Sequence, residues 1–199
     1  MASTTYFHTV ARSYTDVDTS SGVNTAQFLE ATEGVVTLFD SLGSSAFTVV
    51  QNDMNGNIKK IRTRYESNPT ANDTLENLLA NEAHEKKRVA TEGLLWLIRG
   101  LDFTAQALRR SITDQAEELT VSFTKAYEAT LRKFHGMLVR PVFALAMKAC
   151  PYRKDFYEKI NVTNDESLAV MSGWLGALEA IIATAQAVFV AHPEYIKGM

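Results

Sequence analysis

Apolar residues at helical spacing dominate this chain, and the segment 49–67, VVQNDMNGNIKKIRTRYES, shows the pattern most clearly. Its apolar side chains follow one another at intervals of three or four residues, which gathers them on one face of a helix. We find no alternation with a period of two, and only 10 glycines and 4 prolines occur in 199 residues. The pattern therefore predicts an all-α fold, a compact bundle of helices. The stripe consists of Phe47, Val50, Met54, Ile58, Ile61 and Tyr65.

Capping and turn residues divide the chain into seven or eight helices. We expect residues 1–23 to be partly irregular, with at most a short helix. Asn24 or Thr25 is suited to begin a helix that ends at Gly43, and Ser44 or Ser45 to begin the next one. The last long helix is predicted at about 165–191, before His192 and Pro193.

Two helices are predicted in the middle of the chain. Residues 89–110 contain LLWLI, which is apolar on every side and is typical of a buried helix. Asp114 and Glu117 have the spacing of a capping box, so we expect a further helix to begin there and to run as far as Phe134. His84 lies in a charged stretch with Glu82, Glu85, Lys86 and Lys87, which indicates a solvated face.

The bulk properties favour a single cytoplasmic domain spanning residues 1–199. The formal net charge is −3 without a basic stripe, which argues against a nucleic-acid partner. Cys150 is the only cysteine, and this indicates a reducing compartment. The first 22 residues lack the pattern of a secretory signal. Residues 168–191 approach the length of a membrane span, but they include Glu179, so a buried core helix is the better interpretation.

Asp53, Asn57 and Lys60 are the candidate binding residues of the segment 49–67. Positions i, i+4 and i+7 of a helix fall within an arc of roughly 60°. On a helical wheel this polar trio lies roughly 100° from the apolar stripe, so it flanks the core. An acceptor, an amide and a cationic donor together could hold a neutral group rich in hydroxyls. The alternative is an ordinary solvated helix face.

Motifs of an enzyme are missing. The sequence has no HExxH, no P-loop, no G-x-S-x-G elbow and no Glu-x-x-His pair of the di-iron type, so we expect no catalytic residue, metal or cofactor. Cys150 has no histidine near it in sequence that could activate it. Trp96 is either a core residue or a flat surface for stacking, and His135 is either structural or functional.

Four stretches, in this order and at similar separations, resemble the glycolipid transfer protein family. They are NDMNGNIKKI, LLWLIRGLDF, FHG and PYRKDF. The resemblance covers the chain from about residue 25 to its end. It implies a two-layer all-α sandwich of about eight helices and non-enzymatic transfer of glycosphingolipids between membranes. It also implies that the protein makes transient contact with the membrane surface.

The resemblance also implies roles for particular residues. Asp53, Asn57 and Lys60 would bind the hydroxyls of the first sugar, and Trp96 would stack beneath it. His135, together with Asp53, would bind the ceramide amide. Tyr195, in the short tail, would be a further contact to the sugar. The expected lining of the acyl pocket is Phe39, Phe103, Phe143 and Phe156.

Two features separate this chain from its relatives. The branch that carries ceramide-1-phosphate has basic residues where this chain has Asn57 and Trp96, so a glucosyl-, galactosyl- or lactosylceramide type of ligand is favoured. Many animal members have a tryptophan after the His-Gly pair, where this chain has Met137. The membrane anchor is then either weaker or supplied by Tyr152 or Phe156.

Three alternatives remain open from the sequence. The same residues would serve a glycolipid sensor that reports to a partner, and ceramide-1-phosphate remains the alternative ligand. The segment 37–43, TLFDSLG, faintly resembles a motif that docks on endoplasmic-reticulum membrane proteins. Its residues Phe39 and Leu42 are more simply interpreted as core.

Overall fold

The computed structural model describes residues 4–199 and contains nine α-helices and five short 3-10 helices in that part of the chain. Within the same residues there is no β-strand, only two isolated bridges. The predicted fold class is therefore confirmed. The α-helices are α1 (Tyr6–Thr9), α2 (Thr25–Leu38), α3 (Thr48–Ser67), α4 (Leu75–Glu82), α5 (Val89–Thr113), α6 (Leu119–Ala129), α7 (Arg140–Lys148), α8 (Arg153–Lys159) and α9 (Asp165–Ala191).

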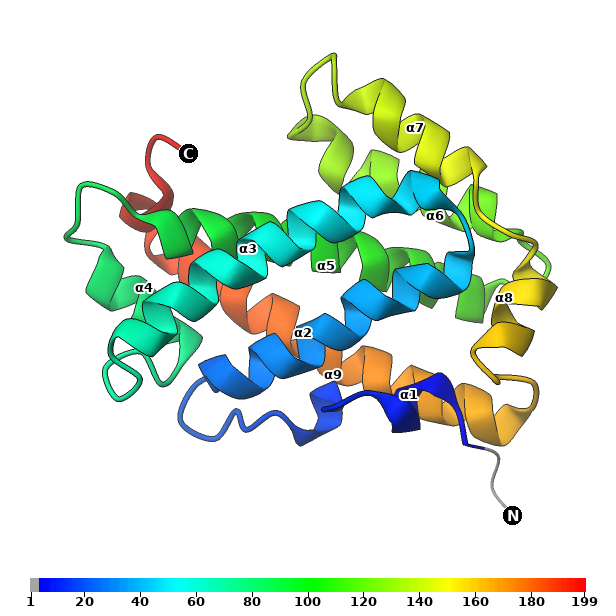
Figure 1. The fold of residues 1–199 in the computed structure, drawn as a ribbon, viewed down its shortest axis with the longest axis horizontal. Helices are drawn as coiled ribbons and strands as arrows, with labels where there is room; N and C mark the ends of the chain where they lie inside the picture. The colour runs from blue at the N-terminus through cyan, green and yellow to red at the C-terminus, as the bar shows by residue number, and fades with distance from the viewer. Residues whose placement is uncertain (1–3) are drawn as a thin grey trace.

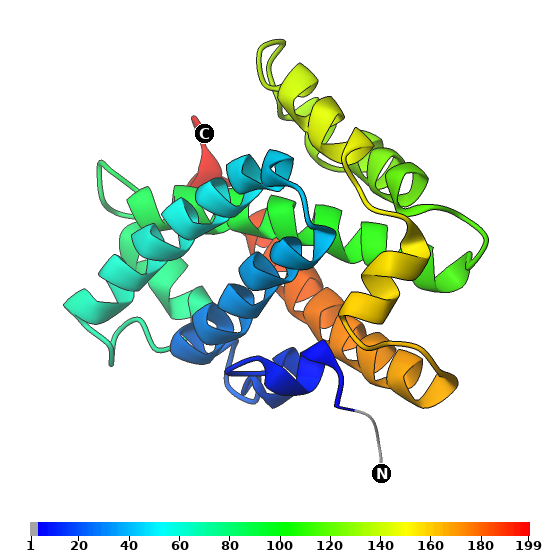
Figure 2. The ribbon, with the colours of Figure 1, turned by 45° about the vertical axis from the view of Figure 1, so that its right-hand side comes forward.

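Helix α5 is the centre of the arrangement. It packs against α3, α6 and α9, and α3 in turn packs against α2 (Figure 1). In Figure 1, α2 and α3 form the front layer, and α5 and α9 lie behind them. Figure 2 shows α7 and α8 on the far side of α5 and α6 from α4. The side chains between these layers form one continuous apolar core.

Capping residues set the helix ends of the front layer as expected. The side chain of Asn24 accepts a hydrogen bond from the backbone of Gln27 at 3.0 Å and begins α2. After α2 a 3-10 turn runs to Leu42, and Gly43 ends it with φ 71°, a left-handed conformation that glycine adopts without strain. Ser44 then caps the short 3-10 turn that leads into α3.

A buried carboxylate caps the central helix. Glu82, at the end of α4, accepts hydrogen bonds from the backbone of Ala90 at 3.0 Å and from both the backbone and the hydroxyl of Thr91 at 2.6 and 2.7 Å. These bonds satisfy donors that the first turn of α5 leaves unpaired. The prediction of a solvated stretch holds for the exposed His84, but it was wrong for Glu82.

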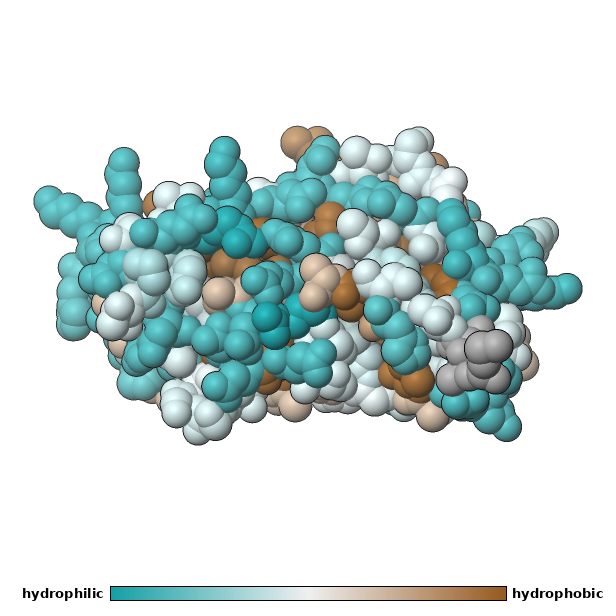
Figure 3. Space-filling model, turned by 60° about the horizontal axis from the view of Figure 1, so that its bottom comes forward, coloured by the Kyte–Doolittle hydropathy of each residue, from teal (hydrophilic) through white to brown (hydrophobic). Residues whose placement is uncertain are grey.

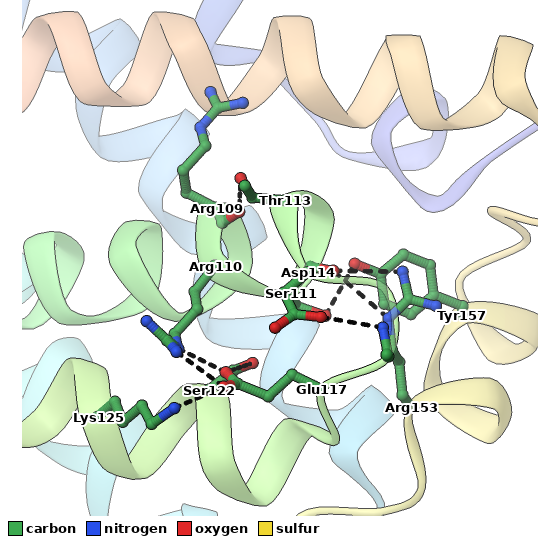
Figure 4. Close-up of polar contacts among 11 residues, drawn as sticks. Arg109, Arg110, Ser111, Thr113, Asp114, Glu117, Ser122, Lys125, Arg153 and Tyr157 are labelled. Atoms are coloured by element: carbon green, nitrogen blue, oxygen red, sulfur yellow. Dashed lines mark hydrogen bonds and ion pairs between the residues drawn. The ribbon is translucent and has the colours of Figure 1, made fainter.

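The connection between α5 and α6 differs from the sequence prediction. Helix α5 continues to Thr113, and Asp114 ends it instead of capping the next helix. Glu117 does not complete a capping box, because its carboxylate pairs with Arg110 of α5 at 2.5 Å and with Lys125 of α6 at 2.8 Å (Figure 4). Helix α6 begins at Leu119.

Helix α6 is also shorter than predicted. It ends at Ala129, and a 3-10 turn at Leu131–Lys133 follows. Phe134 therefore lies in the connection to α7 and not on α6. Pro141 stands in the first turn of α7, where a missing backbone N–H costs nothing.

Helix α9 has the bounds predicted for the last helix. By length and composition alone it could cross a membrane, but that is weak support for a span because core helices pass the same test. One face of α9 is buried in the core through Trp174, Leu175 and Leu178. Glu179 forms a bidentate ion pair with Arg109 of α5, at 2.9 and 2.7 Å, which ties α9 to the central helix.

Candidate functional site

The polar trio of α3 extends from the surface into the contact with α5. Asp53 is exposed, Lys60 is half-buried, and Asn57 is only 4% exposed. The amide of Asn57 donates a hydrogen bond of 3.3 Å to the carboxylate of Asp53. Partial burial raises the pKa of Asp53, and the charge of Lys60 opposes that rise. The solvated-face alternative is therefore wrong for Asn57.

Gly93 brings α5 against the trio. A Cβ at this position would lie 3.1 Å from Cβ of Lys60 and 3.3 Å from the carbonyl oxygen of Asn57. The ammonium of Lys60 reaches across α5 to Glu92 at 3.6 Å. Glu92 and Gly93 are on the turn of α5 that precedes Trp96. Helix α5 therefore contacts Asn57 and Lys60 on one turn and presents Trp96 on the next.

Trp96 is partly exposed and lies in a group of aromatic rings. It stacks with His135 at 6.1 Å between ring centroids, with an interplanar angle of 17°, and meets the edge of Phe134 at 6.4 Å. The guanidinium of Arg99 lies 4.7 Å from the centre of the Trp96 ring. The interpretation of Trp96 as a core residue is therefore wrong, and the structure brings it together with His135.

His135 is partly buried and is held in place by residues of α6 and α7. Its Nδ1 lies 3.2 Å from the hydroxyl of Tyr127, and its ring centroid lies 4.4 Å from that of Phe143. Arg140 donates a hydrogen bond of 2.8 Å to its backbone carbonyl. Burial, and secondarily the charge of Arg140, lowers the pKa of His135, so the ring is neutral at pH 7.

From His135 a row of aromatic contacts runs into the core. Each ring contacts the next, so the row joins the half-buried site to the interior of the fold. At its inner end, Phe39, Phe123 and Phe156 line a cavity of only about 10 Å³, which is too small to hold part of a lipid chain. The successive centroid distances are Phe143–Tyr127 5.4 Å, Tyr127–Phe103 6.4 Å, Phe103–Phe123 5.8 Å, Phe123–Phe47 6.4 Å and Phe47–Phe39 5.7 Å.

Tyr195 has different neighbours from the rest of the predicted site. Its ring stacks on His192 at 4.6 Å, and its backbone carbonyl accepts a hydrogen bond from Arg88 at the start of α5. It lines a surface groove with α4 and the end of α9. A role for Tyr195 at the sugar therefore stays a prediction, and the described contacts do not connect it to the trio.

An exposed apolar surface surrounds the connection between α6 and α7. Met137 and Leu138 are 85% and 90% exposed. Phe156, considered above as a membrane anchor, is only 1% exposed, so that expectation was wrong, whereas Tyr152 is exposed. The exposed apolar residues around this connection, which we call the α6–α7 apolar surface, are Phe134, Met137, Leu138, Val139, Val142 and Leu145. Figure 3, by contrast, shows a face of the molecule that is mainly hydrophilic.

Some residues of the site were missed from the sequence. Gly93 in the middle of an apolar helix is a signal of close helix packing that the sequence does contain. Tyr127 and Arg99 gave no such signal, because an aromatic residue or an arginine at helical spacing has many roles. Phe39 and Leu42 are both 3% exposed, which favours the core interpretation of the segment 37–43.

Comparison with known proteins identifies the family. Its sequence model, described as Glycolipid transfer protein (GLTP), matches residues 23–162. A glycolipid transfer protein of Aureobasidium melanogenum is 51% identical over 179 residues, 89% of each chain, and one of Danio rerio is 41% identical over 150 residues, 70% of this chain and 71% of that one.

Solved structures agree with this result. A fungal glycolipid transfer protein, HET-C2, superposes with a TM-score of 0.86 at 42% identity, over 93% of this chain and 96% of that one. The GLTP fold of FAPP2, described as selecting simple glycosphingolipids, gives 0.85 at 32% identity, over 96% and 97%. Human ceramide-1-phosphate transfer protein, at 17% identity and a TM-score of 0.81, shares the fold. The chain thus belongs to the glycolipid transfer protein family.

Proposed function

We propose that this protein carries glycosphingolipids between membranes in the cytoplasm without a chemical step. The observation that carries the proposal is that Trp96, one turn of α5 beyond the contacts with the trio, stacks on His135, where the aromatic row into the core begins. Two long acyl chains in water cost about 0.8 kcal/mol per CH₂, so spontaneous exchange is slow. An apolar interior reached from a polar opening removes that cost during transit.

The sugar binds at the trio in this proposal. Asp53 accepts hydrogen bonds from hydroxyls, Lys60 donates to them, and the amide of Asn57 does both. The partly exposed Trp96 supplies a flat apolar surface for one face of the ring. A lipid without a sugar would leave these polar groups unpaired, which penalises it.

The ceramide amide binds at His135, assisted by Asp53. Since Nδ1 of His135 faces the hydroxyl of Tyr127, Nε2 is the ring nitrogen left to meet the amide. The acyl chains then follow the aromatic row towards Phe39, Phe103 and Phe156. The cavity there has a volume of only about 10 Å³, so the acyl chains must separate side chains that pack together in the empty protein.

The membrane is met by the α6–α7 apolar surface. Met137 and Leu138 are almost fully exposed there, and the surface begins at Phe134, which contacts Trp96. Docking through this surface would bring the bilayer close to the site. The side chains of Met137 and Leu138 bind a bilayer less firmly than a tryptophan would. Weak binding suits a carrier that must leave the membrane again.

The experiment is transfer of fluorescent glucosylceramide between vesicles by the purified protein. We expect Asp53→Val and Trp96→Ala each to reduce the initial rate at least about tenfold, as the loss of a buried polar or stacking contact implies. Asn55→Val, an exposed change two residues along the same helix, is the matched control. Unchanged transfer by both variants would refute the site.

A second arm tests the ligand. Ceramide-1-phosphate replaces glucosylceramide in the same assay, with the wild-type protein. Because Asn57 and Trp96 add no further cation to Lys60 for a phosphate dianion, we expect slower transfer of the phosphate lipid. Equal rates for the two lipids would overturn the choice of a sugar headgroup and leave the carrier role standing.

A further inference from the structure

A second groove lies behind Trp96, where α5, the turn after α6 and the end of α9 meet. Its volume is about 390 Å³, within the range of small-molecule sites, roughly 300–1,000 Å³. Leu95, Ile98 and Phe189 give it an apolar lining, and Arg99, Asp102 and Lys133 are its charged residues. We call it the α5–α9 groove. None of the trio residues lines it.

The three charges of this groove are not neutralised by one another. Arg99 and Asp102 are one helical turn apart, yet within residues 4–199 neither they nor Lys133 take part in an ion pair shorter than 4.0 Å. Asp102 instead accepts hydrogen bonds from Gln106 at 2.8 Å and from Gln186, also in the groove, at 3.5 Å. The groove therefore keeps its charges available.

The two cations share one aromatic ring. The guanidinium of Arg99 lies 3.7 Å and the ammonium of Lys133 5.0 Å from the centre of Phe134. Burial lowers the pKa of Arg99, which shows that its charge lacks full solvation. A phosphate diester placed between the two cations would supply the missing counter-charge, and arginine binds phosphate oxygens through two parallel hydrogen bonds.

The carboxylate of Asp102 makes the groove selective. A simple anion bound at Arg99 would also meet this negative charge on the next turn of α5. A ligand that carries a phosphate and, a few atoms away, an ammonium would satisfy all three side chains. This is the chemistry of a zwitterionic phospholipid headgroup, such as phosphocholine or phosphoethanolamine.

The position of the groove favours a lipid over a free molecule. Phe134 belongs both to the groove and to the α6–α7 apolar surface. Val190, at the other side of the groove, is 81% exposed. In Figure 1 the connection between α6 and α7 forms the top of the molecule. A protein docked through this side would present the groove to headgroups of the bilayer.

The geometry points to a phospholipid site: the α5–α9 groove binds the headgroup of a zwitterionic phospholipid of the docked membrane, with the phosphate on Arg99 and Lys133 and the ammonium on Asp102. The inference rests on the membrane docking in the proposed function. Arg99 also contacts Trp96, on which the sugar is proposed to stack. Binding of a phospholipid headgroup at Arg99 can therefore affect the sugar site through this one side chain.

The first experiment measures binding of the protein to phosphatidylcholine vesicles that contain no glycolipid. A single ion pair at an exposed site changes a binding equilibrium by up to about fivefold, so we expect Lys133→Ala to weaken binding by about that factor, and Arg99→Gln at least as much. Lys86→Ala, which removes an exposed lysine between α4 and α5, is the matched control. Equal binding of Lys133→Ala and the control would overturn the site. Because Lys133 is exposed, the substitution should leave the fold intact, so a loss of binding by this variant would not reflect unfolding.

The second experiment separates a lipid headgroup from a free ion. Short-chain phosphatidylcholine, short-chain phosphatidylglycerol and inorganic phosphate are titrated separately while the indole N–H resonances are followed by NMR, with Trp96→Phe for assignment. We expect only phosphatidylcholine to shift the Trp96 resonance strongly, and Asp102→Asn to abolish its preference over phosphatidylglycerol. An equal response to inorganic phosphate would show a soluble-anion site and overturn the inference. Neither experiment contains glycolipid. The results of both are therefore independent of whether Asp53→Val blocks glycolipid transfer, so failure of this inference and failure of the proposed function can be told apart.

Discussion

Gly93 of α5 lies directly against the stem of Lys60 in α3. A Cβ on Gly93 would stand 3.1 Å from Cβ and 3.2 Å from Cδ of that lysine. Lys60 is thereby laid across α5 with its ammonium at Glu92, instead of extending into solvent as a lysine on an isolated helix would. The packing of two helices thus decides where a cation of the proposed sugar site points.

The first prediction concerns this contact. Alanine at a helix interior normally stabilises relative to glycine by about 1 kcal/mol, and we expect that gain for Gly100→Ala, where a Cβ would meet no atom within 4 Å. At Gly93 the new methyl must push α3 away, and such overpacking costs about 1–3 kcal/mol. Gly93→Ala should therefore be less stable than Gly100→Ala in urea denaturation and should bind glycolipid more weakly. The interpretation fails if the two variants gain stability equally.

A second prediction concerns acid stability at Glu117. Hydrogen bonds from Arg110, with help from Lys125 and Ser122, lower the pKa of Glu117 to about 2. Because the folded pKa lies below the unfolded one, the carboxylate contributes stability above pH 4.5, and that contribution is lost as the pH falls towards 2. Glu117→Gln should lower the free energy of unfolding at pH 7. At pH 2.5 the difference in free energy of unfolding between this variant and wild type should be smaller than at pH 7.

The control for this acid effect lies on α6, the helix that follows Glu117. Glu128 of α6 is exposed and forms no ion pair among residues 4–199, so Glu128→Gln should change the free energy of unfolding little at either pH. Urea midpoints at several pH values give the comparison. A gap between wild type and Glu117→Gln that stays constant with pH would contradict the prediction.

The third prediction is a titration of His135. Burial is the main cause that lowers its pKa from 6.5, and the charge of Arg140 is the lesser one. NMR should therefore give a pKa below 6.5 for His135, and Arg140→Gln should raise it only part of the way. Since the unfolded chain takes up the proton first, His135 reduces stability as the pH falls below 6.5. A measured pKa at or above 6.5 would show that the ring is not held as described.

The fourth prediction concerns the inner end of the aromatic row. Phe39 is 3% exposed and contacts Phe47, so Phe39→Ala should destabilise the empty protein by about 3–5 kcal/mol, measured in urea. If acyl chains enter here, bound glycolipid should restore more of the melting temperature in this variant than in wild type. Val190→Ala, an exposed change on α9, is the reference. An equal shift in both variants would place the chains elsewhere.

Most of the helices could be predicted from the sequence, because each depends on local signals. Asn24, Gly43 and the pair His192 and Pro193 act within one helical turn. The start of α2, the end of the 3-10 turn after it and the end of α9 followed from them, although α2 itself ends at Leu38 and not at the predicted Leu42. The start of α6 could not be predicted in this way. Glu117 has the spacing of a capping residue, but the ion pairs with Arg110 and Lys125 draw it away from that role.

The site was predictable only in part, for a similar reason. The spacing of Asp53, Asn57 and Lys60 fixes their common side on α3 without any knowledge of the fold. The exposure of Trp96 depends on how α5 packs against the turn after α6, and LLWLI is equally compatible with a fully buried helix. The α5–α9 groove combines residues more than 80 positions apart, which no local pattern contains.

The cavity of about 10 Å³ between Phe39, Phe123 and Phe156 also bears on how an empty molecule behaves. A carrier with a permanent cavity of lipid size would expose apolar side chains to water after each delivery and would be prone to aggregation. Here the side chains fill the space themselves, so the unladen protein returns as a well-packed globule. Loading must then swell the molecule, and a measurable rise in partial specific volume should accompany every lipid taken up.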